Sequence, residues 1–237
     1  MIEASGLTKI YPFYGAALRN VSFTIPDGQF VGILGKNGAG KTTLLRLLAG
    51  VLHGEGCVLY DGLPPEKCYQ NLAYLTERGS FFPEMTPMEY GEFLADFFPR
   101  FDWPRYRRLL DFFELEREKR AGSFSRGQCS KLELAAGFSK GARYILMDEP
   151  FAGKDLFTRK DFLKLLAAGL KTEETILIST HEVEEIENFL DRALVLRFGR
   201  IEGDFLLEEL REEGKTLSGV LAQTLRYDSQ RYREYLK

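Results

Sequence analysis

The sequence predicts an α/β fold with a mostly parallel sheet, an N-terminal antiparallel β subdomain and an inserted all-helical subdomain. Apolar runs typical of buried strands alternate with helical segments in residues 140–190. A glycine-rich stretch, GKNGAGKTT at 35–43, joins an apolar run to an amphipathic one. Residues 87–120 carry Phe and Leu at helical spacing. These features favour one large domain with an insertion.

The first 29 residues predict the edge of the small sheet. Val21, Phe23 and Ile25 alternate with polar residues before Pro-Asp-Gly at 26–28, a pattern typical of a strand that ends in a turn. Tyr11 lies upstream, in a segment that we expect to be a loop. Its ring could stack on a purine base or pack beneath the loop, and the sequence leaves both open.

The glycine-rich stretch predicts a phosphate-binding loop between a strand at 30–34 and a helix. Gly35, four residues and then Gly40, Lys41 and Thr42 fit the P-loop pattern, whose glycines let backbone N–H groups turn toward phosphates at a helix N-terminus. Lys41 is expected to reach the terminal phosphates and Thr42 to ligate Mg²⁺. A glycine-rich turn without a ligand is the alternative.

Three later segments place polar groups after apolar strands. Glu77 follows the run that begins at Leu72, Asp148 and Glu149 end the run YILMDE, and His181 follows TILIST. Because the carboxyl ends of parallel strands meet at one edge of a sheet, we expect these groups near the bound phosphates. Glu149 could instead cap the turn before Pro150.

The remaining segments are predicted as helices and a hairpin. Ser123 or Ser125 could cap a helix that starts near Gly127 and whose first turn could hold an anion. Further helices are expected at 161–170 and in EVEEIENFL, which follows His181. ALVLRFGRIEGDF reads as a closing hairpin, and residues 206–237 form a charged tail with weak helical periodicity.

Composition excludes several classes of protein. The formal net charge of -3 disfavours nonspecific nucleic-acid binding, so no nucleic-acid partner is expected. Cys57, Cys68 and Cys129 are odd in number and lack CxxC spacing, which suggests neither a disulfide framework nor a zinc site. No apolar run approaches the roughly 18 residues of a membrane span. We expect a cytoplasmic protein that reaches a membrane through another chain.

Over about residues 1–205 the chain resembles the nucleotide-binding subunit of ATP-binding cassette (ABC) transporters. GKNGAGKTT resembles the Walker A motif, FSRGQ at 124–128 the family signature, YILMDE at 144–149 Walker B, AGKD the D-loop, and His181 the switch histidine. Many NTPases share a P-loop with a Walker B aspartate. Far fewer classes of NTPase combine a signature about twenty residues before Walker B with a histidine at the end of the next strand.

The resemblance implies an ATPase that uses ATP and Mg²⁺. Its P-loop NTPase core would comprise residues 1–78 and 140–205, with the helical subdomain at 79–139 and a helical tail at 206–237. Glu149 would act as the general base, with His181 and Lys41 as the other catalytic residues. Thr42, Glu77 and Asp148 would hold the metal. The residues expected to bind ATP are Tyr11, Gly35, Lys36, Asn37, Gly38, Ala39, Gly40, Lys41, Thr42 and Thr43.

The resemblance also implies two partners. A second cassette, identical or different, would place its ATP against the signature residues of this chain, while Asp155 contributes across the interface. A separate transmembrane subunit would dock near Glu77–Tyr90, although these apolar residues could instead belong to the helical core. The signature residues expected to act in trans are Ser125, Arg126, Gly127 and Gln128.

The sequence departs from the family pattern at several positions. Glu77 stands where Gln is usual, Phe124 and Arg126 replace Leu and Gly, and Lys154 replaces the D-loop Leu. The overall pattern, including LTERGSFFPEMT, indicates export by fold-level analogy. The alternative is a soluble ABC ATPase in nucleic-acid or ribosome-linked processes, whose usual insertions are absent here. A P-loop kinase or GTPase would leave FSRGQ unexplained.

Overall fold

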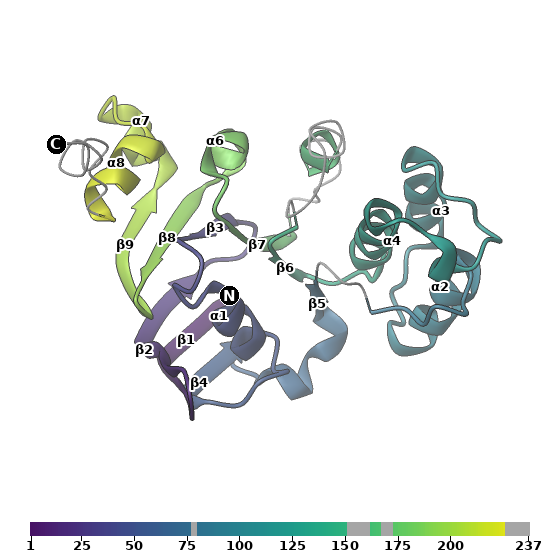
Figure 1. The fold of residues 1–237 in the computed structure, drawn as a ribbon, viewed down its shortest axis with the longest axis horizontal. Coiled ribbons are helices and arrows are strands. Elements are labelled where there is room, and N and C mark those ends of the chain that lie inside the picture. Colours follow the sequence, from purple (N-terminus) through teal and green to yellow (C-terminus); the bar gives the residue numbers. More distant parts are fainter. Residues whose placement is uncertain (77–79, 151–161, 167–172, 226–237) are drawn as a thin grey trace, which may run out of the picture.

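The computed structural model describes residues 1–76, 80–150, 162–166 and 173–225 (Figure 1). The predictions made for Glu77, Lys154 and Asp155 therefore lie outside the described residues. Of the helix expected at 161–170, residues 162–166 are described and are helical.

A mostly parallel sheet forms the centre of the molecule, which confirms the predicted α/β class. Its strand order is β5-β6-β7-β3-β8-β9, and β9 alone among these runs antiparallel to its neighbour. Strands β3, β6 and β7 are apolar over nearly their whole length because both faces of the sheet are covered. The strands are β3 (Phe30–Leu34), β5 (Leu72–Leu75), β6 (Tyr144–Asp148), β7 (Thr175–Thr180), β8 (Arg192–Arg197) and β9 (Arg200–Leu206).

A smaller antiparallel sheet lies below the central one in Figure 1, with the order β2-β1-β4. Helix α1 (Lys41–Leu48) lies between the two sheets and buries Leu44, Leu45 and Leu48 completely. The small sheet thus presses the start of α1 against the carboxyl ends of β3 and β6. Its strands are β1 (Ile2–Tyr11), β2 (Gly15–Ile25) and β4 (Glu55–Tyr60).

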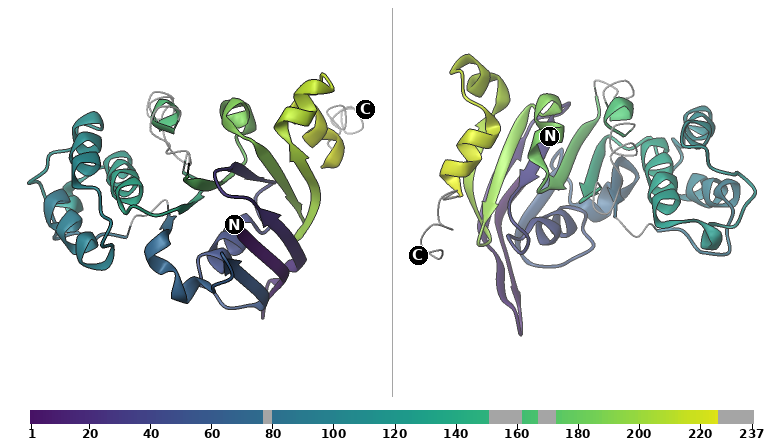
Figure 2. Two further views of the ribbon diagram at one scale, coloured as in Figure 1. Left: turned by 180° about the vertical axis from the view of Figure 1, so that it is seen from behind. Right: turned by 45° about the horizontal axis from the view of Figure 1, so that its top comes forward.

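The helical subdomain projects at one end of the molecule, on the side of edge strand β5 (Figures 1 and 2). Its aromatic core includes Tyr90 and Tyr106, both almost completely buried, and the Tyr106 hydroxyl donates to the Pro87 carbonyl at 2.7 Å. Thr86 and Ser125 cap their helices in reciprocal boxes with the side chains three residues on. The helices are α2 (Pro87–Phe97), α3 (Trp103–Phe112) and α4 (Arg126–Ser139).

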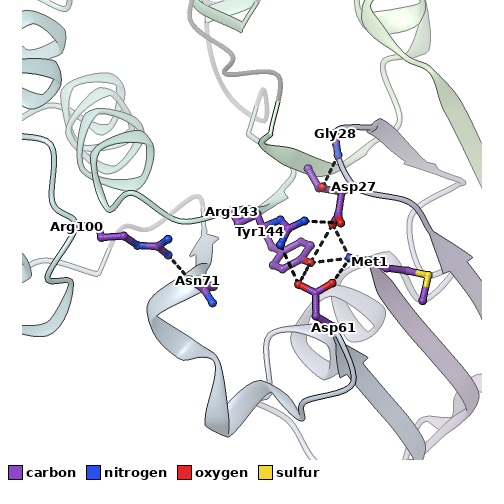
Figure 3. A network of polar contacts seen from close by, with 9 residues as sticks. Met1, Asp27, Gly28, Asp61, Asn71, Arg100, Arg143 and Tyr144 are labelled. Carbon is purple, nitrogen blue, oxygen red and sulfur yellow. Dashed lines mark hydrogen bonds and ion pairs between the residues drawn. The ribbon is translucent and has the colours of Figure 1, made fainter.

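A polar network at the amino ends of β3 and β6, the ends away from the phosphate-binding loop, ties the small sheet to β6 (Figure 3). Arg143 donates to Asp27 at 2.5 Å and to Asp61 at 3.0 Å, and the Tyr144 hydroxyl lies within 3.0 Å of both carboxylates. Asp27 follows β2 and Asp61 follows β4, so one arginine links three segments distant in sequence. In the same view, Arg100 of the helical subdomain donates to Asn71, just before β5.

The C-terminal part of the described chain completes the central sheet and packs on the face away from α1. The hairpin β8–β9 confirms the predicted closing hairpin. Beyond it, α7 (Leu207–Glu212) and α8 (Leu217–Thr224) bury Leu207 and Leu217 against the core, so these residues are more than a solvated tail. Within the residues that the structure describes, no helix combines the length and apolar character needed to span a bilayer.

The helix predicted in EVEEIENFL is shorter than expected. It forms one α-helical turn, α6 (Val183–Ile186), and then a 3₁₀ turn at Glu187–Phe189. The chain must leave the helix early because the next residues pair with β3. Asp191 donates its N–H to the Phe30 carbonyl at 2.9 Å and accepts the Phe30 N–H on its carboxylate at 2.7 Å.

Candidate active site

The loop between β3 and α1 adopts a conformation that requires glycine. Gly40 has a φ of 110°, and a Cβ atom there would lie 2.5 Å from the Ala17 carbonyl of β2. Gly40 is also the N-cap of α1, where no side chain caps the helix. The first N–H groups of α1 are therefore left to an anion, as the P-loop prediction requires.

Lys41 turns back over the loop instead of reaching into solvent. Its side chain is 5% exposed, and its ammonium group donates to the Gly35 carbonyl at 2.8 Å and the Lys36 carbonyl at 3.5 Å. The same group lies 2.9 Å from the Glu149 carboxylate. A lysine and a carboxylate predicted on two different segments thus form an ion pair.

Asp148, at the end of β6, gathers hydroxyl groups from three elements. Its Oδ1 atom accepts hydrogen bonds from Thr42 at 2.9 Å and from Ser179 at 2.8 Å, and its Oδ2 atom lies 3.4 Å from the Tyr74 hydroxyl. Burial, and secondarily the Asp148 carboxylate, raises the pKa of Tyr74, which keeps that hydroxyl protonated. These oxygen atoms are of the kind that hard cations bind.

Glu149 is held in a strained conformation at the start of the next loop. Its φ of 47° lies in the left-handed region, and its N–H donates to the Ser179 hydroxyl at 2.9 Å and carbonyl at 3.1 Å. The side chain lies between two partners: Oε1 contacts Lys41, and Oε2 lies 3.0 Å from Nδ1 of His181. Strain at a residue fixed by its neighbours is typical of a functional position.

A cleft of about 450 Å³ connects these groups. It brings together much of the predicted loop with both Glu149 and His181, so strand ends far apart in sequence meet as expected. Gly35, Lys36 and Ala39 belong to the loop but do not line the cleft. The lining residues are Ala17, Asn37, Gly38, Gly40, Lys41, Thr42, Thr43, Glu149 and His181.

Tyr11 does not lie in a loop, so this part of the prediction is wrong. It is the last residue of β1, paired with Gly15 of β2, and the turn is confined to Pro12–Tyr14. Lys9 lies over its ring, with the ammonium 5.6 Å from the ring centre. Tyr11 is absent from the cleft lining, whereas Ala17 of the same hairpin is present. Stacking of Tyr11 on a base stays a prediction.

The signature residues lie apart from this cleft. Ser125 is the N-cap of α4, and its hydroxyl accepts the Gln128 N–H at 3.2 Å while Gln128 accepts the Ser125 N–H at 3.0 Å. Arg126 is exposed in the first turn, and Gly127 follows it. Helix α4 is in the projecting helical subdomain, away from α1 (Figure 1). None of the four lines the nucleotide cleft.

Sequence reasoning missed Ser179, Tyr74 and Ala17. Ser179 is completely buried, and it both donates to Asp148 and accepts from Glu149. A signal for it was present, because a serine one residue before the end of the apolar run TILIST needs a buried partner. The backbone carbonyl of Ala17 lies against Gly40, and the identity of the residue does not predict such a backbone contact.

Comparison with known proteins now gives the family. The model described as "ABC transporter" matches residues 18–152, which include the glycine-rich loop, the signature and Walker B. The chain belongs to the ABC transporter family. It is an ATP-binding ATPase subunit of that family, with the cassette fold that the resemblance implied.

Relatives of the ABC cassette cover nearly all of it. It is 33% identical to the ABC transporter ATP-binding protein YtrB of Bacillus subtilis (strain 168), over 90% of this chain and 74% of that one. It is 27% identical to the SkfA peptide export ATP-binding protein SkfE of the same organism, over 93% and 95%. A solved ATP-binding subunit of an ABC transporter superposes with a TM-score of 0.84, at 24% identity, over 95% and 99% of the two chains.

A second solved structure shares the fold in a different state. It is a dimeric ATP-binding cassette bound to ADP and phosphate after hydrolysis, with a TM-score of 0.77 and 24% identity over 87% of this chain and 99% of that one.

Proposed function

We propose that this cassette hydrolyses ATP with Glu149 as the general base, in a dimer that drives separate membrane subunits in export. The observation that carries the proposal is the meeting of Lys41, Glu149 and His181 in one cleft at the N-terminus of α1. A base within reach of a phosphate-binding lysine is the arrangement that hydrolysis of a terminal phosphate requires.

The chemistry follows from the contacts in the free site. Entering ATP places its terminal phosphates against the free N–H groups of α1 and against Lys41, which gives up its contact with Glu149. The released carboxylate accepts a proton from the water that attacks the γ phosphorus, while His181 fixes the position of Glu149 from its other oxygen. ADP and inorganic phosphate are the products.

Thr42 and Asp148 are the residues that would hold Mg²⁺. Among the described residues no group of three or more His, Cys, Asp or Glu side chains could hold a metal ion, so an ion here would share its ligands between these oxygens and the nucleotide. When bound, the ion supplies positive charge that neutralises the phosphate oxygens. Glu77 remains a proposed third ligand.

The separation of the signature from the cleft supports a dimer. The Ser125 hydroxyl can still donate a hydrogen bond while it caps α4, and the Gly127 N–H lies in the first turn of that helix, but both lie in a different part of the molecule from Lys41. A second cassette, turned head to tail, would place its ATP against them. A solved cassette with the same fold is a dimer, which supports this proposal.

The dock for the membrane subunit is proposed at residues 77–90. Phe82 is 54% exposed there, and its ring packs edge-on against Phe93 of α2. An exposed aromatic side chain on a structured base is suited to a partner helix. Attachment there would hold this cassette on the cytoplasmic face of the membrane. Outward transport is supported by the relative named for peptide export.

Phosphate release by a Glu149→Gln variant tests the proposal. Gln keeps the shape of the side chain but cannot accept the proton, so turnover falls by about 10²–10⁴-fold while Mg-ATP still binds. Glu116→Gln, which removes an equal charge from an exposed ion pair in the helical subdomain, is the control and keeps its turnover. A Glu149→Gln chain with undiminished turnover excludes Glu149 as the base.

The same variant tests the dimer. Because it binds ATP without consuming it, the Glu149→Gln chain is expected to sediment as a dimer with Mg-ATP and as a monomer with Mg-ADP. A chain that stays monomeric at saturating Mg-ATP contradicts the shared site.

A further inference from the structure

A buried carboxylate joins the signature helix to the proposed membrane dock. Glu133 lies on α4, two turns after Ser125, and is only 2% exposed. Its Oε2 atom accepts the Ser80 N–H at 3.0 Å, and the Ser80 hydroxyl lies 3.1 Å from Oε1. The Tyr90 hydroxyl lies 3.3 Å from Oε2 and 2.9 Å from the Ser80 hydroxyl.

These contacts add to the backbone hydrogen bonds that already tie the dock to the residues before α4, from Ala121 to Met85 at 2.8 Å and from Gly122 to Pro83 at 2.7 Å. Ser80 is the first described residue after the segment that contains Glu77, and Tyr90 lies in α2 at the other end of residues 77–90. Glu133 therefore holds both ends of the described part of the dock, Ser80 and Tyr90, from the helix that presents the signature. Because one of these contacts is to the backbone N–H of Ser80, they fix the main chain of the dock at Ser80 relative to α4.

Packing alone does not explain a carboxylate at this position. Leu132 and Leu134, on either side of Glu133, are buried, and an apolar side chain would complete the same surface of α4. Burying a charge costs free energy unless several hydrogen bonds compensate it. Burial, together with the nearby Glu133 charge, raises the pKa of both Tyr90 and Tyr106, so the tyrosines that face Glu133 stay protonated.

We propose that Glu133 is a positioning residue that transmits displacement of residues 80–90, the described part of the dock, to Ser125 and Gly127. The inference rests on the proposed dimer, in which those two residues close over the partner's ATP. Without Glu133 the signature helix would still fold, and Ala121 and Gly122 would still bond Met85 and Pro83, but the middle of α4 would lose its contacts with Ser80 and Tyr90. Its loss should therefore weaken closure of the dimer and leave nucleotide binding to the chain's own loop unchanged.

The test uses the full chain with Glu149→Gln, so that ATP is bound without turnover. Glu133→Leu is added to remove the hydrogen bonds while filling the volume, and Glu133→Gln to keep an acceptor for the Ser80 N–H. Ser139→Ala is the matched control: its buried hydroxyl bonds the Ala135 carbonyl at 2.7 Å, within α4 itself. Sedimentation gives the ATP concentration for half-maximal dimerisation, and calorimetry with ADP gives binding to the chain's own loop.

Glu133→Leu is expected to raise the ATP concentration for half-maximal dimerisation about tenfold, the usual size of a coupling between sites, with ADP affinity within about twofold. Glu133→Gln should dimerise at an ATP concentration close to that of the parent chain, and Ser139→Ala should leave that concentration unchanged. A merely structural role would move Ser139→Ala and Glu133→Leu together. If Glu133→Leu fails to fold, Tyr90→Phe decides, with a smaller shift expected in the same direction.

Two results would overturn the inference, and they differ in what else they exclude. If the Glu149→Gln parent dimerises and Glu133→Leu dimerises at the same ATP concentration, Glu133 does not position the signature, while the proposed function stands. If the parent itself does not dimerise with ATP, the shared site is wrong and the role of Glu133 is wrong with it.

Discussion

The ion pair between Lys41 and Glu149 predicts that Glu149→Gln weakens the fold of the nucleotide-free chain and strengthens ATP binding. Unit charges 2.9 Å apart attract by about 6 kcal/mol at an effective dielectric constant of ~20, and desolvation of the two groups offsets most of this. A hydrogen bond to a charged group keeps about 1.5–3 kcal/mol. We therefore expect the free energy of unfolding to fall by about 2 kcal/mol.

The proposed binding of ATP to Lys41 would break the same contact, so the free energy of that contact should appear in the binding equilibrium. Removing it from the free state should tighten binding of a non-hydrolysable Mg-ATP analogue by about 2 kcal/mol, roughly thirtyfold. Because Gln keeps the size of Glu and tolerates the left-handed region equally, the backbone strain at this position is unchanged.

Denaturant unfolding of the free chain and calorimetry with the analogue measure the two quantities, with Glu116→Gln as the equal-charge control. Stability and affinity should move in opposite directions by similar amounts. Tighter binding without a loss of stability would refute the reasoning. It would point instead to relief of charge repulsion between Glu149 and the phosphates, which requires no contact between Glu149 and Lys41 in the free chain.

Two further predictions concern the loop and the thiols. Gly40→Ala should destabilise the chain by about 3 kcal/mol and abolish ATP binding, since its Cβ would meet the Ala17 carbonyl. The Cβ of Gly38→Ala would meet only open space, so this variant should lose about 1 kcal/mol of stability. Chemical denaturation of the two variants compares these losses. Cys57 is exposed, while burial raises the pKa of the Cys68 thiol and leaves less thiolate, so iodoacetamide at pH 8 should modify Cys57 at least roughly tenfold faster, as followed by peptide mass spectrometry.

The sequence predicted those features whose physics is local. Gly40 needs a left-handed backbone beside a helix start, and Asp148 ends an apolar strand, so a short pattern was sufficient for each. Tyr11 was misplaced because the hairpin turn is only three residues long and the strand before it runs to its edge. Glu133 was hidden inside an apolar helical period, since its partners Ser80 and Tyr90 lie 43 or more residues away.

Ser179 shows why the geometry of a site exceeds its motif. It links Asp148 and Glu149, two adjacent residues, by donating to the carboxylate of one and accepting from the backbone of the other. The strained turn between them is held from β7, whose next residues lead to His181. β7 therefore holds the turn at Glu149, while His181, which follows that strand, contacts the Glu149 side chain. A shift of β7 would move the Ser179 contacts of the Glu149 N–H together with His181, which contacts Oε2, whereas the contact of Oε1 with Lys41 comes from α1.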